Sequence, residues 1–386
     1  MSLSPRLWLG IFLMLPLVLS AQKKGRVFNQ MEMTPLAAVP ALPDAFPQVV
    51  GTQIIGPAYK FTKDDAILEA AKGISQMGSR VLKINVQVPA QLTEYMTMPF
   101  THYIIWYRSN GAWVSGFTPE MKRREYNAMY AFTKDLLTRY DATGKTFFIG
   151  HWEGDWYLLP DQDVKKDVTP EAAAAMIEWL NVRQQAVDDA RAEVPYSKCR
   201  VFTYTEVNRV RDAMKDGKKR LVNTVLPKVN VDFVSYSAYD SQLLSAEEVR
   251  ATLDYINGQI PPKLGLPAKR VFIGECGLAW AYCGGDGAVH EKKNREILGK
   301  FLSWRPAFVL FWQYYNNEVK DGQQVGFWLI DNKNKKTPLY DTMAELFAAQ
   351  EQLGRDLKAR SRRLPALEEV AAFSENWLTA RGGAAK

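Results

Sequence analysis

Short runs of β-branched and aromatic residues alternate along this chain with segments whose apolar positions recur at helical spacing. Strands separated by amphipathic helices are typical of βα units, which build a parallel sheet. The pattern predicts eight strands, at residues 51–59, 80–86, 101–107, 146–152, 200–207, 231–239, 270–276 and 307–315.

Amphipathic helices are predicted between most of these strands. One of them opens with Ser245 and Glu248, whose spacing predicts a capping box. The connection at 87–99 shows no clear helix, and the segment at 324–331 predicts a small extra strand or a hairpin after the eighth strand. The helices are expected at residues 63–78, 125–140, 169–194, 245–260 and 290–305.

Eight βα repeats predict an α/β fold, a (β/α)8 TIM barrel, as a single domain with a C-terminal helical extension. We expect the barrel at residues 49–348 and the helical tail at 349–386. An open doubly wound sheet is the alternative. It is disfavoured because the first strand runs into "GPAYK", which has no glycine-rich phosphate loop.

The first 21 residues have the order of a secretory signal peptide, with Arg6, an apolar run from Leu7 to Leu19, and then Ser20 and Ala21. The run is shorter than the roughly 20 apolar residues of a membrane span. An uncleaved N-terminal anchor is the alternative. Residues 22–48, rich in proline and alanine, predict an extended lead-in. We therefore expect an exported protein, periplasmic or extracellular, that has no membrane contact after signal cleavage.

The net charge and the histidine and cysteine content narrow the classes of partner that we expect for this protein. A formal charge of +7 is modest for 386 residues, and the basic stretch "RDLKARSRR" is typical of a solvated helix face rather than a nucleic-acid site. The three histidines and three cysteines show no metal-ligand spacing, so we predict neither a metal nor a cofactor. In an exported protein, Cys276 and Cys283 are the expected disulfide pair, with Cys199 left free.

The ends of the predicted strands carry the candidate chemistry, because active sites of barrels lie at the carboxyl ends of the strands. Glu153 follows the fourth strand and Glu275 ends the seventh. A glutamate directly after an apolar strand is costly to bury unpaired, so we expect both to face this rim. A structural ion pair is the alternative for each. The candidates for substrate binding are His151, Trp152, Asp155, Trp156, Tyr59, Asn85, Trp106, Glu206, Asn208, Tyr239, Trp312 and Tyr314.

Carboxylates beside aromatic rings, with few histidines, favour glycoside hydrolysis. That reaction needs two carboxyl groups that flank the glycosidic bond, and aromatic rings stack on sugar faces. The sequence thus predicts a carbohydrate substrate. His151 is expected to be a hydrogen-bonded neighbour rather than a catalyst, and Glu206 either lines the cleft or forms a structural ion pair.

The chain resembles the clan A, or 4/7, superfamily of retaining (β/α)8-barrel glycoside hydrolases over residues 51 to 348. The resemblance lies in Glu153 after the fourth strand, Glu275 at the end of the seventh, and "FVLFWQYYNN" with Trp312 at the eighth. The segment "GFWLIDNKNKKTPLYDTMAELF" is similar to the closing segment of the clan. The resemblance implies that Glu153 is the acid/base and Glu275 the nucleophile of a double displacement.

One position departs from the clan pattern. The residue before the acid/base glutamate is usually an asparagine that binds the 2-hydroxyl group of the substrate, and here it is Trp152. Either another residue, such as Asn85 or His151, supplies this contact, or the chemistry has diverged. A catalytically inactive carbohydrate-binding barrel, an inverting hydrolase and a transglycosylase therefore remain alternatives.

Overall fold

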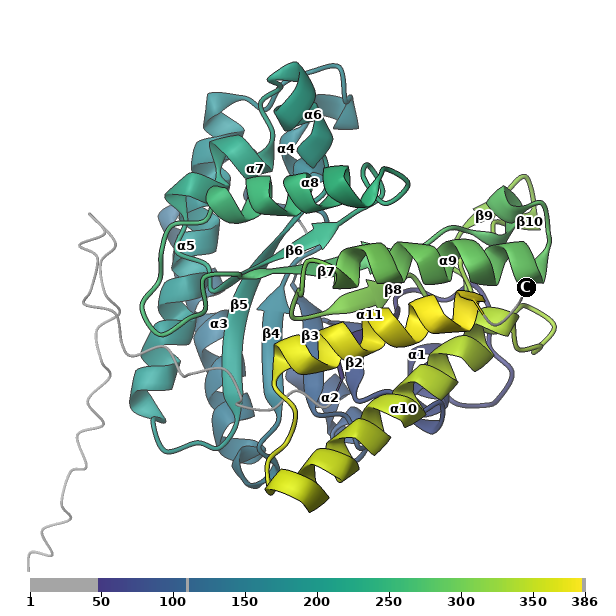
Figure 1. Ribbon diagram of the computed structural model, residues 1–386. Helices are drawn as coiled ribbons and strands as arrows, with labels where there is room; N and C mark the ends of the chain where they lie inside the picture. The colour runs from purple at the N-terminus through teal and green to yellow at the C-terminus, as the bar shows by residue number, and fades with distance from the viewer. Residues whose placement is uncertain (1–47, 109–110, 384–386) are drawn as a thin grey trace, which may run out of the picture. The chain divides into compact units, whose positions relative to one another are not determined.

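The computed structural model describes residues 48–108 and 111–383. Within these ranges, eight parallel strands close into one barrel in chain order, with helices around the outside (Figure 1). This confirms the predicted (β/α)8 barrel. The predicted signal peptide (1–21) and all of the lead-in except residue 48 lie outside the described residues. The strands are β1 (Val50–Ile54), β2 (Val81–Val86), β3 (His102–Tyr107), β4 (Thr146–Gly150), β5 (Arg200–Val207), β6 (Phe233–Ser237), β7 (Val271–Cys276) and β8 (Val309–Phe311).

All five predicted helices are present, and short helices occupy several loops. The connection between β2 and β3 contains one of these, α2. The extra hairpin lies earlier than predicted, at β9 (Val319–Lys320) and β10 (Gln323–Gln324), while Ile330 forms only an isolated bridge with Lys336. The helices are α1 (Ala66–Gln76), α2 (Leu92–Tyr95), α3 (Pro119–Arg139), α4 (Gly154–Leu158), α5 (Pro170–Glu193), α6 (Val210–Asp216), α7 (Leu221–Thr224), α8 (Ala246–Gly258), α9 (Gly287–Leu302), α10 (Pro338–Ser361) and α11 (Leu367–Gly383).

The three longest helices, α3, α5 and α10, begin with the same Thr-Pro pair. Thr118, Thr169 and Thr337 each accept a hydrogen bond from a backbone N–H of the first turn, and the proline that follows needs no such partner. At α8, the predicted capping box of Ser245 and Glu248 is confirmed. These local signals fix where the helices start and hence the lengths of the loops at the rim.

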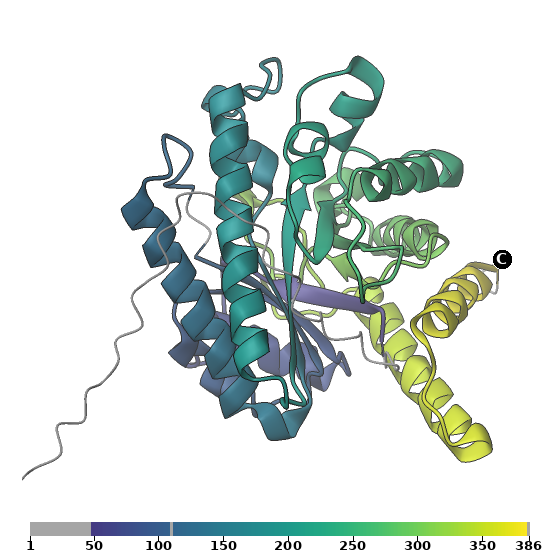
Figure 2. The same ribbon diagram turned by 90° about the vertical axis from the view of Figure 1, so that its left-hand side faces the viewer.

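Helices cover the outside of the barrel in neighbouring pairs. The long helices α3 and α5 run side by side (Figure 2). The C-terminal extension is helical, as predicted: α10 runs across residue 348, and α11 then lies against α9 (Figure 1). An ion pair of 2.6 Å between Arg305 and Glu375 ties α11 to the loop before β8. Across residues 48–108 and 111–383, no helix combines the length and the apolar character that a membrane span needs.

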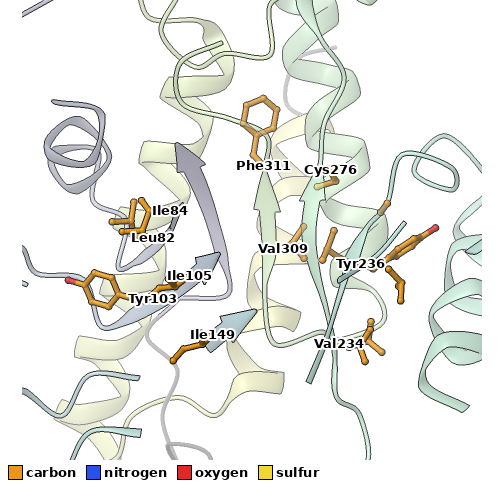
Figure 3. Packing of buried hydrophobic residues seen from close by; sticks show 14 of the residues in the cluster. Leu82, Ile84, Tyr103, Ile105, Ile149, Val234, Tyr236, Cys276, Val309 and Phe311 are labelled. Atoms are coloured by element: carbon orange, nitrogen blue, oxygen red, sulfur yellow. The ribbon is translucent and has the colours of Figure 1, made fainter. Parts of the chain in front are cut away.

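Alternation along the strands sorts their side chains into two sets. One set, which includes Leu82, Ile84 and Tyr103, packs against the surrounding helices (Figure 3). The other set fills the barrel. Five fully buried phenylalanine rings form a layer inside it, near the amino ends of their strands. These rings belong to Phe148, Phe202, Phe233, Phe272 and Phe308.

The three cysteines are all buried free thiols. The expected disulfide between Cys276 and Cys283 is therefore absent. Cys276 ends β7 on the face that packs against the helices, where its thiol lies 3.6 Å from the carbonyl oxygen of Leu310 on β8 (Figure 3). Cys283 lies on a short 3-10 helix in the loop after β7.

Candidate active site

Glu275 reaches the interior of the barrel because β7 carries one extra residue. Tyr236 of β6 pairs with Ile273, but the next residue, Ser237, pairs with Glu275, so that Gly274 is left without a partner. Strict alternation from Ile273, which packs against the helices, would turn Glu275 outward as well. This β-bulge redirects the carboxyl group to the inside, a use of bulges that is common beside active sites.

Glu153 stands at the start of α4, just beyond the end of β4. Its carboxyl group accepts hydrogen bonds from the Ser237 hydroxyl and the Trp156 indole N–H, and its backbone N–H donates to Glu206 at 3.2 Å. Burial raises the pKa of Glu153 to about 7; the Ser237 hydrogen bond opposes the rise and the Glu206 charge adds to it. A carboxyl group with this pKa keeps its proton near neutrality, as a general acid must.

Glu275 receives a positive charge directly. The Lys83 ammonium lies 3.2 Å from its Oε1, while the Ser237 and Tyr239 hydroxyls lie 3.4 and 3.5 Å from its Oε2. Burial raises the pKa of Glu275, Lys83 opposes the rise, and the neighbouring carboxylates Glu206 and Glu153 add to it. The ionised form of Glu275 therefore depends on Lys83.

The Ser237 hydroxyl contacts one carboxyl oxygen of each glutamate and so limits the distance between these two oxygens. It lies within hydrogen-bonding reach of Oε1 of Glu153 and Oε2 of Glu275. Two atoms in contact with the same oxygen can be no further apart than the two contact lengths together, here about 6 Å. That limit applies to one oxygen of each carboxyl group, and it is compatible with the roughly 5–5.5 Å between the carboxyl groups of retaining glycosidases.

Both carboxyl groups open into a cavity of about 510 Å³. Six of the predicted substrate-binding residues line it, namely Trp106, Trp152, Trp156, Asn208, Tyr239 and Trp312. Four tryptophans around two carboxyl groups give apolar faces for sugar rings beside the groups that can react. The remaining lining residues are Ile55, Arg209, Ser237, Asp240, Asn317 and Glu318.

Two predicted residues close to Glu153 in sequence lie behind the cavity wall. Asp155 is fully buried, and its carboxylate accepts the backbone N–H groups of Leu221, Asn208 and Arg209 at 2.8, 3.2 and 3.4 Å. It fastens the loop after β4 to the loops after β5 rather than lining the cavity.

His151, also fully buried, lies 2.7 Å from both the Trp152 carbonyl and the Thr205 hydroxyl. Burial lowers its pKa to about 3, so its ring is neutral at physiological pH. It is the hydrogen-bonded neighbour that the sequence suggested, and it does not line the cavity.

Three further predicted residues also lie outside the cavity lining. The Tyr59 hydroxyl donates to the Ile330 carbonyl at 2.6 Å, and Tyr314 is buried against Tyr315. The Asn85 side chain accepts from Gln87 at 2.8 Å. Neither Asn85 nor His151 is among the residues that line the cavity.

Glu206, the last of the predicted set, is fully buried beneath the lining, between Lys83, Ser235 and the backbone of Glu153. Sequence reasoning missed Lys83 and Ser237, although each carried a signal. Lys83 is a lone cation inside the apolar strand "VLKINV". Ser237 continues the inward alternation of the strand that begins at Phe233. In the described part of the chain, no cluster of histidine, cysteine, aspartate and glutamate is suited to hold a metal ion.

Comparison with known proteins supports the fold independently. No protein-family model matches the sequence, and no curated protein matches it. Among solved structures, a family 5 xyloglucanase from Paenibacillus pabuli matches with a TM-score of 0.52 at 11% identity, over 79% of this chain and 99% of the other. This chain has a (β/α)8-barrel fold similar to that of this xyloglucanase.

Two further solved structures are similar to this barrel. A GH5-4 broad specificity endoglucanase from Bacteroides salanitronis matches with a TM-score of 0.50 at 10% identity, over 84% of this chain and 99% of the other. A GH2 β-galacturonidase from Eisenbergiella tayi matches with a TM-score of 0.48 at 12% identity, over 78% of this chain. The chain spans only 51% of the length of that β-galacturonidase.

Proposed function

We propose that this protein is an exported glycoside hydrolase that cleaves O-glycosidic bonds of a poly- or oligosaccharide by retaining double displacement. The observation that carries the proposal is the shared contact of Glu153 and Glu275 with the Ser237 hydroxyl, because it brings one carboxyl oxygen of each to within about 6 Å of the other, compatible with the spacing of a retaining enzyme. The tryptophan-lined cavity above them supports a carbohydrate substrate. Export is inferred from residues 1–21 of the sequence.

The surroundings of the two glutamates support different roles. Glu275 faces the Lys83 ammonium, which favours a carboxylate, whereas Glu153 faces neutral donors from Ser237 and Trp156. A cation stabilises an ionised neighbour more strongly than a neutral donor does. Glu275 is therefore the nucleophile of the proposal, and Glu153 is its acid/base.

In the first step, a carboxylate oxygen of Glu275 attacks the anomeric carbon while the bond to the leaving oxygen breaks. Glu153 gives its proton to that oxygen and becomes a carboxylate. In the second step, Glu153 takes a proton from water as the water oxygen attacks the anomeric carbon. The bond to Glu275 then breaks, which restores both side chains.

The experiment combines hydrolysis with covalent trapping. The full chain is assayed on xyloglucan, carboxymethylcellulose and a panel of 4-nitrophenyl β-glycosides, because the structural neighbours include a xyloglucanase and an endoglucanase. We expect Glu275→Gln to abolish turnover and Glu153→Gln to lower it by about 10²–10⁴-fold, the usual contribution of a general acid. A 2-deoxy-2-fluoro glycoside of any sugar that is turned over should lose its leaving group and add the mass of its fluoroglycosyl group to the wild type but not to Glu275→Gln.

The matched control is Glu125→Gln, which removes a carboxylate paired with buried Arg183 at 2.8 Å outside the cavity. It should keep the wild-type rate. Binding of these glycans without turnover would replace the proposal with a carbohydrate-binding barrel. An initial product of inverted anomeric configuration, measured by NMR, would rule out double displacement.

A further inference from the structure

A third carboxylate, Glu206, lies beneath the two proposed catalytic residues and has no step in the proposed reaction. Its Oε2 accepts from the Lys83 ammonium at 3.0 Å and from the Ser235 hydroxyl at 2.6 Å, and its Oε1 accepts the backbone N–H of Glu153 at 3.2 Å. All the hydrogen-bond partners that the described chain gives Glu206 are donors. A carboxylate, which only accepts, can satisfy all three of these contacts at once.

Lys83 is the cation of this buried group. Its ammonium has three N–H donors, and three acceptors surround it: Glu206 at 3.0 Å, the carbonyl oxygen of Gly274 at 3.1 Å and Glu275 at 3.2 Å. The side chain is fully buried, and its ammonium also lies 4.5 Å from the centre of the Trp106 ring. Every donor is used, so the geometry holds the charge between Glu206 and Glu275.

We propose that Glu206 is a positioning residue whose fixed ion pair with Lys83 sets the net charge facing Glu153 and Glu275, so that one keeps its proton while the other is ionised. The inference rests on the proposed roles of these two glutamates. The sequence alone predicts that Glu206 either lines the cleft or forms a structural ion pair. The inference assigns it to neither role, because Glu206 does not line the cavity and its ion pair with Lys83 lies next to the reacting groups.

The two members of the pair act in opposite directions. The positive charge of Lys83 lowers the pKa of both Glu153 and Glu275, and the negative charge of Glu206 raises both. With Lys83 alone, Glu153 would lose its proton too easily to act as an acid at neutral pH. With Glu206 alone, Glu275 would hold a proton and could not attack. The other ionisable groups that line the cavity are Arg209, Tyr239, Asp240 and Glu318.

Direct titration tests the inference without relying on turnover. The full chain is labelled with ¹³C at the glutamate carboxyl carbons, and the resonance of Glu153 is identified by its absence in Glu153→Gln. In Glu206→Gln, the midpoint of Glu153 should fall by about one pH unit or more, the usual effect of a charge within about 4–6 Å. In Lys83→Met, the same midpoint should rise.

Two controls separate this role from a structural one. In the double variant Lys83→Met/Glu206→Gln, which removes one positive and one negative charge together, the Glu153 midpoint should return toward the wild-type value. In Glu125→Gln, which disturbs an ion pair outside the cavity, the midpoint should not move. An unchanged Glu153 midpoint in both Glu206→Gln and Lys83→Met would overturn the inference.

The pH profile of hydrolysis provides the second readout. In Glu206→Gln, both limbs of the kcat/KM profile should move to lower pH, because the pKa values of both catalytic glutamates fall. A uniform loss of rate with unmoved limbs would mark Glu206 as purely structural and contradict the inference. If the NMR midpoints move as expected but no glycoside is cleaved, the proposed function fails while the electrostatic role of the pair stands.

Discussion

Glu153 follows strand β4 and Glu275 lies within β7, and yet both face the same hydroxyl group, that of Ser237. One hydroxyl carries one proton, so it can donate to only one of them at a time. The closer contact is with Glu153, while Glu275 also has Lys83. The hydroxyl of Ser237 thus donates mainly to Glu153, the acid/base of the proposed reaction. Its removal should therefore shift the pKa of Glu153 in a definite direction.

Ser237→Ala should move the alkaline limb of activity to higher pH. The hydrogen bond from Ser237 lowers the pKa of Glu153, so its loss lets Glu153 keep its proton longer. A hydrogen bond worth about 1 kcal/mol corresponds to a shift of somewhat less than one pH unit. The measurement is the pH dependence of kcat/KM. A shift of this limb toward acid would contradict the assignment.

The raised pKa of Glu153 also predicts a gain in stability when its charge is removed. Folding raises this pKa from its usual 4.5 to about 7, so the unfolded chain binds fewer protons between these values, and the free energy of unfolding falls as pH rises through them. Glu153→Gln should therefore raise the free energy of unfolding by about 2–3 kcal/mol at pH 8 and by little at pH 4. Urea unfolding at both pH values measures this change in the free energy of unfolding. An equal change at both pH values would contradict the prediction.

Gly274→Ala should destabilise the barrel and disturb the site. A Cβ at this position would lie 1.8 Å from the Ser235 hydroxyl oxygen and 2.6 Å from Oε2 of Glu206, so the buried side chains of Ser235 and Glu206 or the strand itself must move. Overpacking of this kind costs about 1–3 kcal/mol or more. Gly299→Ala is the matched control, since it adds the same methyl group in α9 with open space around it. The control should gain up to about 1 kcal/mol in thermal unfolding.

Asp155→Asn should cost stability rather than substrate affinity. Asp155 accepts three backbone N–H groups in a fully buried position, and an amide nitrogen facing one of them leaves a donor unpaired. We expect a loss of about 1–3 kcal/mol in the free energy of unfolding with KM close to wild type. A large rise in KM with unchanged stability would instead restore Asp155 as a substrate-binding residue.

The strands and the two principal glutamates could be predicted because they depend on local patterns. Apolar runs mark the strands, and Glu153 and Glu275 stand where such runs end. What could not be predicted depends on contacts between strands. The bulge at Gly274 arises from the pairing of β6 with β7, and a period-2 count along β7 alone would send Glu275 to the wrong side.

The ion pair of Lys83 and Glu206 illustrates the same limit. Each residue is visible as a charge within a strand, but they lie on β2 and β5, and only closure of the barrel brings their side chains together. Asp155 and Tyr59 show a different limit. Both are polar groups next to strand ends, yet their hydrogen bonds go to the backbone of loops and not to the cavity.

The phenylalanine layer inside the barrel determines the route by which water reaches the site and sugar leaves it. Five fully buried rings, Phe148, Phe202, Phe233, Phe272 and Phe308, seal the interior below the carboxyl groups, so solvent cannot arrive from the amino ends of the strands. In the proposed reaction, the incoming water must enter by the same mouth through which the departing sugar leaves. An alcohol present at that mouth then competes with water for the glycosyl group on Glu275. The acceptor that reaches the anomeric carbon first determines the product.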